Sequence, residues 1–173
     1  GRIYTVGRLD EESKGLIILT NDGEFANRVM HPRYGVTKTY AVKLDGRISD
    51  SDVQKVRDGV YLYEGRAAGA RVLIKKRTRE TTQLEVTLQE GKNREIRRAI
   101  EEIGYPVNRL LRVSYGPFQL GTLKEGEVEE LRAKVVRDQL GLAAPEGDGE
   151  AQKKPQRSNR PTRNSARTDA PKG

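Results

Sequence analysis

Apolar and polar positions alternate in several segments of the chain, which is the period of a β-strand with one buried face. Residues 38–44 follow this pattern, with Tyr40 on the apolar face, and residues 82–88 repeat it. Residues 15–20 are apolar almost throughout, which predicts one continuous strand covered on both faces. Shorter strands are expected near residues 2–6, 60–63, 70–75 and 107–115.

Other segments have the helical period. Apolar residues recur every three or four positions over 93–103, so Ile96 and Ile100 lie on one face of a predicted helix. Asn21 is expected to cap a helix that ends before Pro32. Two further helices are expected, one capped by Ser49 or Asp50 and one over residues 126–140. Consecutive strands with interspersed helices predict an α+β fold with a mixed, mainly antiparallel sheet and flanking helices.

Composition excludes several kinds of site. The 173 residues include no cysteine and a single histidine, so we expect neither a disulfide nor a metal site, and no cofactor. The net charge of +8 favours a polyanionic partner. Because no apolar run is long enough to cross a bilayer and no secretory signal is evident, we expect a cytoplasmic monomer without a membrane partner.

The chain divides into two zones. Residues 1–144 alternate apolar runs with turn signals and are expected to form one domain. Residues 145–173 contain no large apolar residue, so they cannot bury enough surface to offset their ordering entropy. We therefore expect a disordered tail, which is basic, with a net charge of +6 beyond residue 150.

The strongest chemical signal lies between Gly7 and Gly23. This segment reads GRLD at residues 7–10 and SKGLIILTNDG at residues 13–23. A short loop at the edge of a strand holds one carboxylate, Asp10, in a rigid setting that suits a nucleophile. Spacing alone favours the simpler interpretation of an aspartate that bonds its own backbone in a turn.

These motifs resemble those of the RsuA/RluB-type ribosomal RNA pseudouridine synthases, and EGKNREIRR at residues 90–98 resembles the third motif of that family. The resemblance implies the pseudouridine synthase catalytic fold and an enzyme that isomerises a flipped-out uridine of ribosomal RNA to pseudouridine. It also implies that Asp10 is the nucleophile. The sequences of the third motif and of residues 108–116 are closer to those of the large-subunit, RluB-like branch. The resemblance therefore favours 23S RNA as the substrate.

The resemblance assigns two further catalytic residues. A nucleophilic carboxylate needs a nearby cation to stay ionised, and the family places a basic residue at the Arg97 position against that carboxylate. The alternative is that Arg97 forms an exposed ion pair with Glu101. Tyr40 is implied to lie against the target base and help move a proton, whereas pattern alone favours an ordinary core tyrosine.

Basic residues near these motifs are candidate RNA contacts. In the family, an arginine at the Arg8 position approaches the RNA backbone, although Arg8 alone would suggest a surface salt bridge. Arg94 and Arg98 are predicted to point away from the apolar helix face and to be free for phosphates, yet a basic helix face is more often only solvated. The candidates are Arg8, Lys38, Lys92, Arg94 and Arg98.

Two alternatives remain for the function. A non-catalytic RNA-binding or ribosome-assembly factor on the same fold would explain the charge, but it would not need Asp10, Tyr40 and Arg97 together. A DNA-binding module has little support, because no helix-turn-helix or zinc motif is evident. The family usually carries an N-terminal RNA-binding domain of the S4 type, so we expect an upstream part beyond Gly1.

Removal of residues 145–173 should leave the melting temperature nearly unchanged, because the tail has no apolar residue to pack. RNA affinity should fall and depend less on salt, with a log–log slope smaller by about 0.7–0.9 for each phosphate that the tail no longer binds. Binding titrations at several salt concentrations test this, and an unchanged slope would show that the tail does not touch RNA.

Overall fold

The computed structural model describes residues 1–89 and 93–143. Two predictions, the RNA contact at Lys92 and the disordered tail over 145–173, lie outside these residues. In the described part of the chain, no helix is long and apolar enough to cross a membrane.

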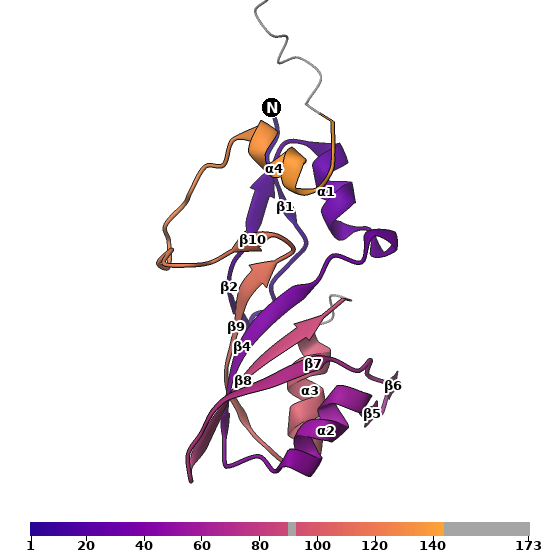
Figure 1. Ribbon diagram of the computed structural model, residues 1–173, viewed down its shortest axis with the longest axis vertical. Coiled ribbons are helices and arrows are strands. Elements are labelled where there is room, and N and C mark those ends of the chain that lie inside the picture. The colour runs from indigo at the N-terminus through magenta and orange to yellow at the C-terminus, as the bar shows by residue number, and fades with distance from the viewer. Residues whose placement is uncertain (90–92, 144–173) are drawn as a thin grey trace, which may run out of the picture.

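A mixed, mainly antiparallel sheet forms the centre of the described structure, which confirms the predicted α+β class. The strand order is β10-β9-β4-β8-β7, and the short strand β2 pairs in parallel with β9 (Figure 1). The strands are β2 (Lys14–Gly15), β4 (Lys38–Asp45), β7 (Arg71–Arg77), β8 (Thr81–Leu88), β9 (Val107–Tyr115) and β10 (Phe118–Gln119).

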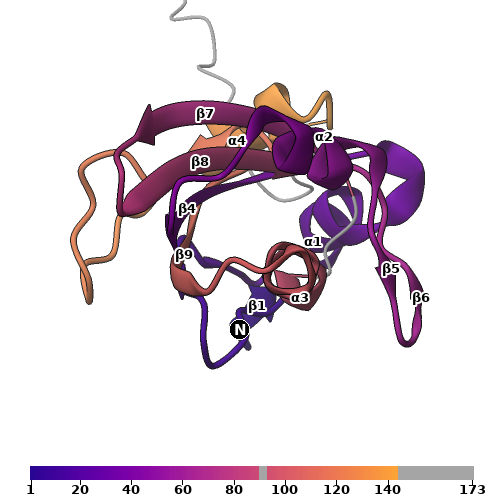
Figure 2. The ribbon, with the colours of Figure 1, turned by 90° about the horizontal axis from the view of Figure 1, so that it is seen from below.

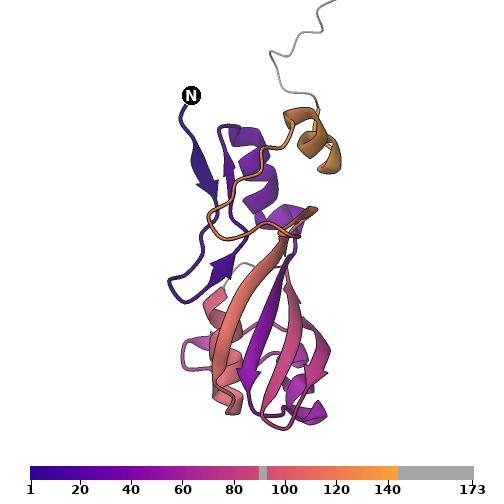
Figure 3. The ribbon, with the colours of Figure 1, turned by 90° about the vertical axis from the view of Figure 1, so that its left-hand side faces the viewer.

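Two helices cover one face of this sheet, α2 (Asp50–Asp58) and α3 (Asn93–Ile103). The sheet curves around them, as the view along the strands shows (Figure 2). Tyr40 is fully buried among the apolar residues of β4, β8, β9 and both helices, as its place in the alternating pattern predicts. The opposite face of the sheet carries no helix (Figure 3).

A second apolar cluster lies at the other end of the long strands β4 and β9 (Figure 1). Its buried members include Val6, Leu16 and Tyr115. The elements around it are β1 (Tyr4–Val6), β3 (Ile18–Thr20), α1 (Gly23–Met30), a 3₁₀ turn (Pro32–Tyr34) and α4 (Ala133–Gln139). The remaining strands are β5 (Tyr61–Leu62) and β6 (Gly65–Arg66), which form a hairpin beside α3.

The prediction of one continuous strand over residues 15–20 is wrong. The chain leaves the main sheet after Gly15 and pairs again only as β3, with β1. The break falls at Leu16, whose main-chain carbonyl accepts a hydrogen bond from the Arg112 side chain at 2.8 Å. Leu19 is 53% exposed, so β3 is not covered on both faces.

Two helix boundaries also differ from the prediction. Asp22, and not Asn21, caps α1 by accepting a hydrogen bond from the Phe25 amide. Ser49 caps α2, one of the two caps that the sequence allowed. The last helix begins at Ala133 instead of near residue 126, because Val128 is 83% exposed and a short helix without a packed face is marginal in water.

Gly15→Ala should destabilise the fold more than Gly65→Ala. Both glycines have positive φ, +113° and +132°, so each replacement adds backbone strain on the order of 1–3 kcal/mol. A Cβ at Gly15 would also overlap the main chain of Arg112, whereas a Cβ at Gly65 meets no atom within 4 Å. We expect Gly15→Ala to lower the free energy of unfolding by about 1 kcal/mol or more beyond the control, as overpacking does. Denaturant titration measures both losses, and equal losses would contradict the packing argument.

Candidate active site

The loop of residues 7–16, which we call the Asp10 loop, is held on both sides of Asp10 by one buried arginine. Arg112 donates from Nε to the Leu16 carbonyl at 2.8 Å and from Nη1 to the Arg8 carbonyl at 3.4 Å. The Leu16 amide in turn donates to the Arg112 carbonyl at 2.9 Å. These bonds tie the loop to β9.

A second arginine holds the middle of the loop. Arg97 donates from Nη2 to the Glu12 carbonyl at 3.1 Å, and its Nε lies 3.2 Å from the Glu12 carboxylate. A longer ion pair joins Arg97 to Glu101 at 3.7 Å, as the alternative interpretation expected. The predicted contact between Arg97 and Asp10 is not observed; the carboxylate of the loop that Arg97 meets is that of Glu12. Arg97 therefore acts on the Asp10 loop rather than on the Asp10 carboxylate.

Asp10 itself is half-buried, with its carbonyl accepting a hydrogen bond from the Ser13 amide at 3.0 Å. That bond makes a turn, but it joins main-chain groups, and no bond from the Asp10 side chain to its own backbone is found among the described residues. Asp10 also belongs to none of the ion pairs within residues 1–89 and 93–143.

Tyr40 lies opposite Arg112 in the pairing of β4 with β9, and both side chains are fully buried. Burial raises the pKa of the Tyr40 phenol, and the neighbouring Arg112 guanidinium opposes that rise. The charge of Asp10 makes the smallest contribution to the rise in the Tyr40 pKa, so the carboxylate lies in the neighbourhood of the phenol. Arg112 lies opposite Tyr40 of the first apolar cluster and against Tyr115 of the second.

An irregularity in β9 decides which side chains face this site. Tyr40 pairs with Arg112 while its neighbour Thr39 pairs with Ser114, so Val113 is an extra residue in β9. Without this bulge, strand alternation would place Arg112 and Tyr115 on opposite faces. With it, both face inward and are buried, at 0% and 2% exposure.

Lys38 adds a second cation on the same face. Its Nζ lies 4.7 Å from the centre of the Tyr115 ring, and the guanidinium carbon of Arg112 lies 5.0 Å from that ring. Burial, and next the charge of Arg112, lower the pKa of Lys38. The Tyr115 hydroxyl lies 3.6 Å from where a Cβ on Gly7 would stand, so this group adjoins the start of the Asp10 loop.

Comparison with known proteins identifies the family of this chain. Residues 1–102 match the family model described as RNA pseudouridylate synthase. The chain belongs to the RNA pseudouridylate synthase family. Proteins of this family act on RNA, which agrees with the basic charge of the sequence.

Similar proteins include ribosomal large subunit pseudouridine synthase B of Bacillus subtilis, which is 40% identical over 144 residues. That alignment covers 82% of this chain and 59% of the relative. The protein of the same name from Yersinia pestis is 43% identical over 136 residues, covering 78% of this chain and 43% of the relative. The chain thus spans about half the length of these curated relatives.

A solved structure supports the fold. A crystal structure of a pseudouridylate synthase superposes with a TM-score of 0.71 at 26% sequence identity, over 80% of this chain and 59% of that chain. The α+β architecture is therefore that of a pseudouridine synthase catalytic domain.

The predicted RNA contacts of this family member differ in their surroundings. Arg8 has an exposed side chain and Lys38 is half-buried. Arg98 is not free as predicted, because it pairs with Glu64 of the β5–β6 hairpin, with Nη1 and Oε1 2.5 Å apart. The side chain of Arg94, like all of Lys92, lies outside the described residues.

Sequence reasoning missed Arg112 and Tyr115 as site residues. One signal was available for Arg112, which stands two residues after the buried Leu110 on a strand, so a charge occupies an inward position. No such signal marks Tyr115, because the bulge at Val113 shifts the alternation and cannot be read from the sequence.

Arg97→Ala should lower the single-turnover rate far more than Arg98→Ala. Arg97 holds the loop that carries Asp10, and a misplacement of about 1 Å can cost on the order of 10²-fold in rate. Arg98 pairs with Glu64 of the hairpin and has no bond to the Asp10 loop within the described residues. Single-turnover assays at saturating protein compare the two variants, and equal losses would show that the Arg97 clamp does not position Asp10.

Proposed function

We propose that this chain converts a uridine of large-subunit ribosomal RNA into pseudouridine. The observation that carries the proposal is the half-buried Asp10, free of ion pairs among the described residues and held beside Tyr40 by a loop that Arg112 and Arg97 clamp. The names of the similar bacterial enzymes support the choice of the large subunit. A ribosomal RNA substrate would place the reaction in the cytoplasm, and the proposed chemistry requires only one copy of the chain.

The chemistry uses Asp10 first. Its carboxylate adds to ribose C1′, or stabilises the sugar cation, as the bond from C1′ to uracil N1 breaks and its electron pair leaves with the base. The base then turns and C5 bonds to C1′, which releases the carboxylate. The proton on C5 is removed and N1 gains a proton, so the product is an isomer of the substrate.

In this proposal Tyr40 acts in the second half of the reaction, once the flipped base reaches its ring, which is buried in the free protein. A uracil flipped out of its stack can lie against the phenol ring, and the phenol oxygen can take part in the proton transfer from C5. Burial raises the pKa of the Tyr40 phenol, and Arg112 lowers it. Arg112 therefore favours transfer of the C5 proton to the phenol oxygen. Arg97 has a positioning role through Glu12.

The surrounding surface offers room for flanking nucleotides. A groove of about 790 Å³ opens between β8, α2 and α3. Thr37, which precedes Lys38 in the sequence, lines this groove. So does Val86, which pairs with Tyr40 across the sheet. Arg8, on the Asp10 loop, is exposed and suited to a phosphate. In this proposal the domain of residues 1–144 supplies the chemistry, while the tail adds charge for RNA affinity.

Asp10→Asn should leave the fold intact and abolish pseudouridine formation, because an amide is not a nucleophile at C1′. The matched control is Glu11→Gln, which neutralises the next, exposed residue of the same loop. Each purified protein is incubated with transcripts of 23S RNA, and pseudouridine is measured by mass spectrometry of the digested RNA. Normal product from a folded Asp10→Asn protein would falsify the catalytic assignment. Loss of product in the control as well would show that loop charge, not the Asp10 carboxylate, is what matters.

A further inference from the structure

Two cations inside the site have no acidic partner among the described residues. Arg112 is fully buried and Lys38 is half-buried, and neither belongs to any of the ion pairs within residues 1–89 and 93–143. The other buried arginine of this part of the chain, Arg137, is instead neutralised by Asp22 at 2.6 Å and Glu24 at 3.2 Å. Among the described residues, carboxylates thus neutralise the buried Arg137 but not the buried Arg112.

An unneutralised buried charge is unfavourable, so its presence calls for an explanation. A guanidinium does not lose its proton at any ordinary pH, and burial without a counter-charge removes its hydration with nothing to replace it. Two donors of Arg112 are used on the carbonyls of Arg8 and Leu16. Its Nη2 is buried and has no hydrogen-bond partner among the described residues. Because Arg112 is fully buried, it supplies positive charge from beneath the site, and the half-buried Lys38 is the cation that a ligand can reach.

Lys38 reinforces this positive charge. Both cations lie against the ring of Tyr115, and their mutual repulsion contributes to the lowered pKa of Lys38. Asp10 offers one negative charge near Tyr40, which leaves a net positive charge on the group. The chemistry of the site is thus that of a receptor for one anion.

Lys38 and Arg112 together are called the inner cation pair. We propose that Lys38 binds one phosphate of the RNA backbone next to the target uridine, with the ring of Tyr115 beside it and the buried charge of Arg112 behind that ring. This proposal rests on the function proposed above. Two residues of a strand span about 6.8 Å, so a phosphate at Lys38 lies within about one nucleotide of a base at Tyr40. The contact would hold the flipped nucleotide while Asp10 attacks C1′.

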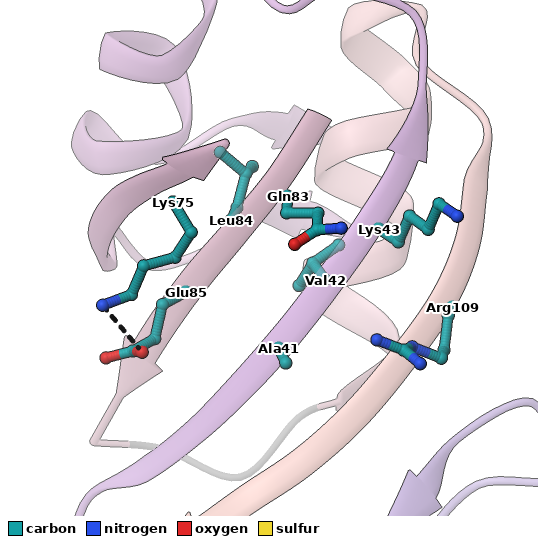
Figure 4. A pocket seen from close by; sticks show the side chains of 8 residues that line it. All are labelled: Ala41, Val42, Lys43, Lys75, Gln83, Leu84, Glu85 and Arg109. Carbon is teal, nitrogen blue, oxygen red and sulfur yellow. Dashed lines mark ion pairs between the residues drawn. The ribbon is translucent and has the colours of Figure 1, made fainter. Parts of the chain in front are cut away.

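The opposite face of the sheet provides a matched control. Lys43 and Arg109, the outer cation pair, are also cross-strand neighbours on β4 and β9. Figure 4 shows them beside Ala41 on the face without helices, across a shallow hollow from the ion pair of Lys75 and Glu85. They carry the same charge as the inner pair, and Lys43 is half-buried like Lys38, but Arg109 is exposed where Arg112 is buried, and neither has a ring contact among the described residues.

The test compares Lys38→Gln with Lys43→Gln in the full chain, after thermal melting has confirmed that both fold. Binding of a 23S RNA fragment is measured over a range of salt concentrations. Lys38→Gln should reduce the log–log salt slope by about 0.7, the value of one phosphate contact on a single strand, and Lys43→Gln should leave it unchanged. The same RNA is then prepared with a neutral methylphosphonate at one linkage at a time around the modified uridine.

Wild type and Lys43→Gln should lose affinity at one such linkage, whereas Lys38→Gln should lose nothing further there. In a second arm, inorganic phosphate should shift the NMR signal of the Arg112 Nε–H in the wild type and less in Lys38→Gln. Equal salt slopes and equal methylphosphonate penalties in all three proteins would overturn the phosphate site. Pseudouridine is assayed in the same samples, so a wild type that shows the phosphate coupling but forms no product would contradict only the proposed function.

Discussion

The burial of Arg112 is the constraint on which the site depends. Its guanidinium lies between the two apolar clusters, opposite Tyr40 on one side and against Tyr115 on the other. Its donors reach the main chain at Arg8 and Leu16, on either side of Asp10. The same side chain takes the Leu16 carbonyl just after β2, where the regular pairing of β2 with β9 stops. One buried cation thus holds the main chain of the loop on both sides of Asp10.

The bulge at Val113 makes this arrangement possible. An extra residue in β9 reverses the alternation of side chains, so that Arg112 and Tyr115 share the inner face. Arg97 then fastens the middle of the Asp10 loop to α3 through Glu12. The loop that carries Asp10 is thus held at both ends and at its centre. Such preorganisation is a large part of what a protein can contribute to lowering a reaction barrier.

Much of the fold follows from sequence patterns, and the exceptions have physical causes. Alternation predicted β4 and β8, and the helical period predicted α3 with Ile96 and Ile100 buried, because these elements bury one continuous apolar face. The prediction of one strand over residues 15–20 was wrong. The Arg112 side chain, which is distant in sequence, donates a hydrogen bond to the Leu16 carbonyl at the point where the strand breaks. The partner of Arg97 also differs from the expectation, since Arg97 pairs with Glu12 and Glu101. The choice between Asp10 and Glu12 depends on the path of the loop, which the sequence pattern does not give.

A crystal structure of the Asp10→Asn protein bound to its unreacted RNA substrate would test the central claim most directly. We expect the target uracil against the ring of Tyr40, with ribose C1′ facing residue 10 and a backbone phosphate in contact with Lys38. The Asp10 loop should keep its bonds to Arg112 and Arg97. A target uridine bound away from Tyr40, or a flipped nucleotide with solvent at Lys38 and its phosphates elsewhere, would contradict this interpretation.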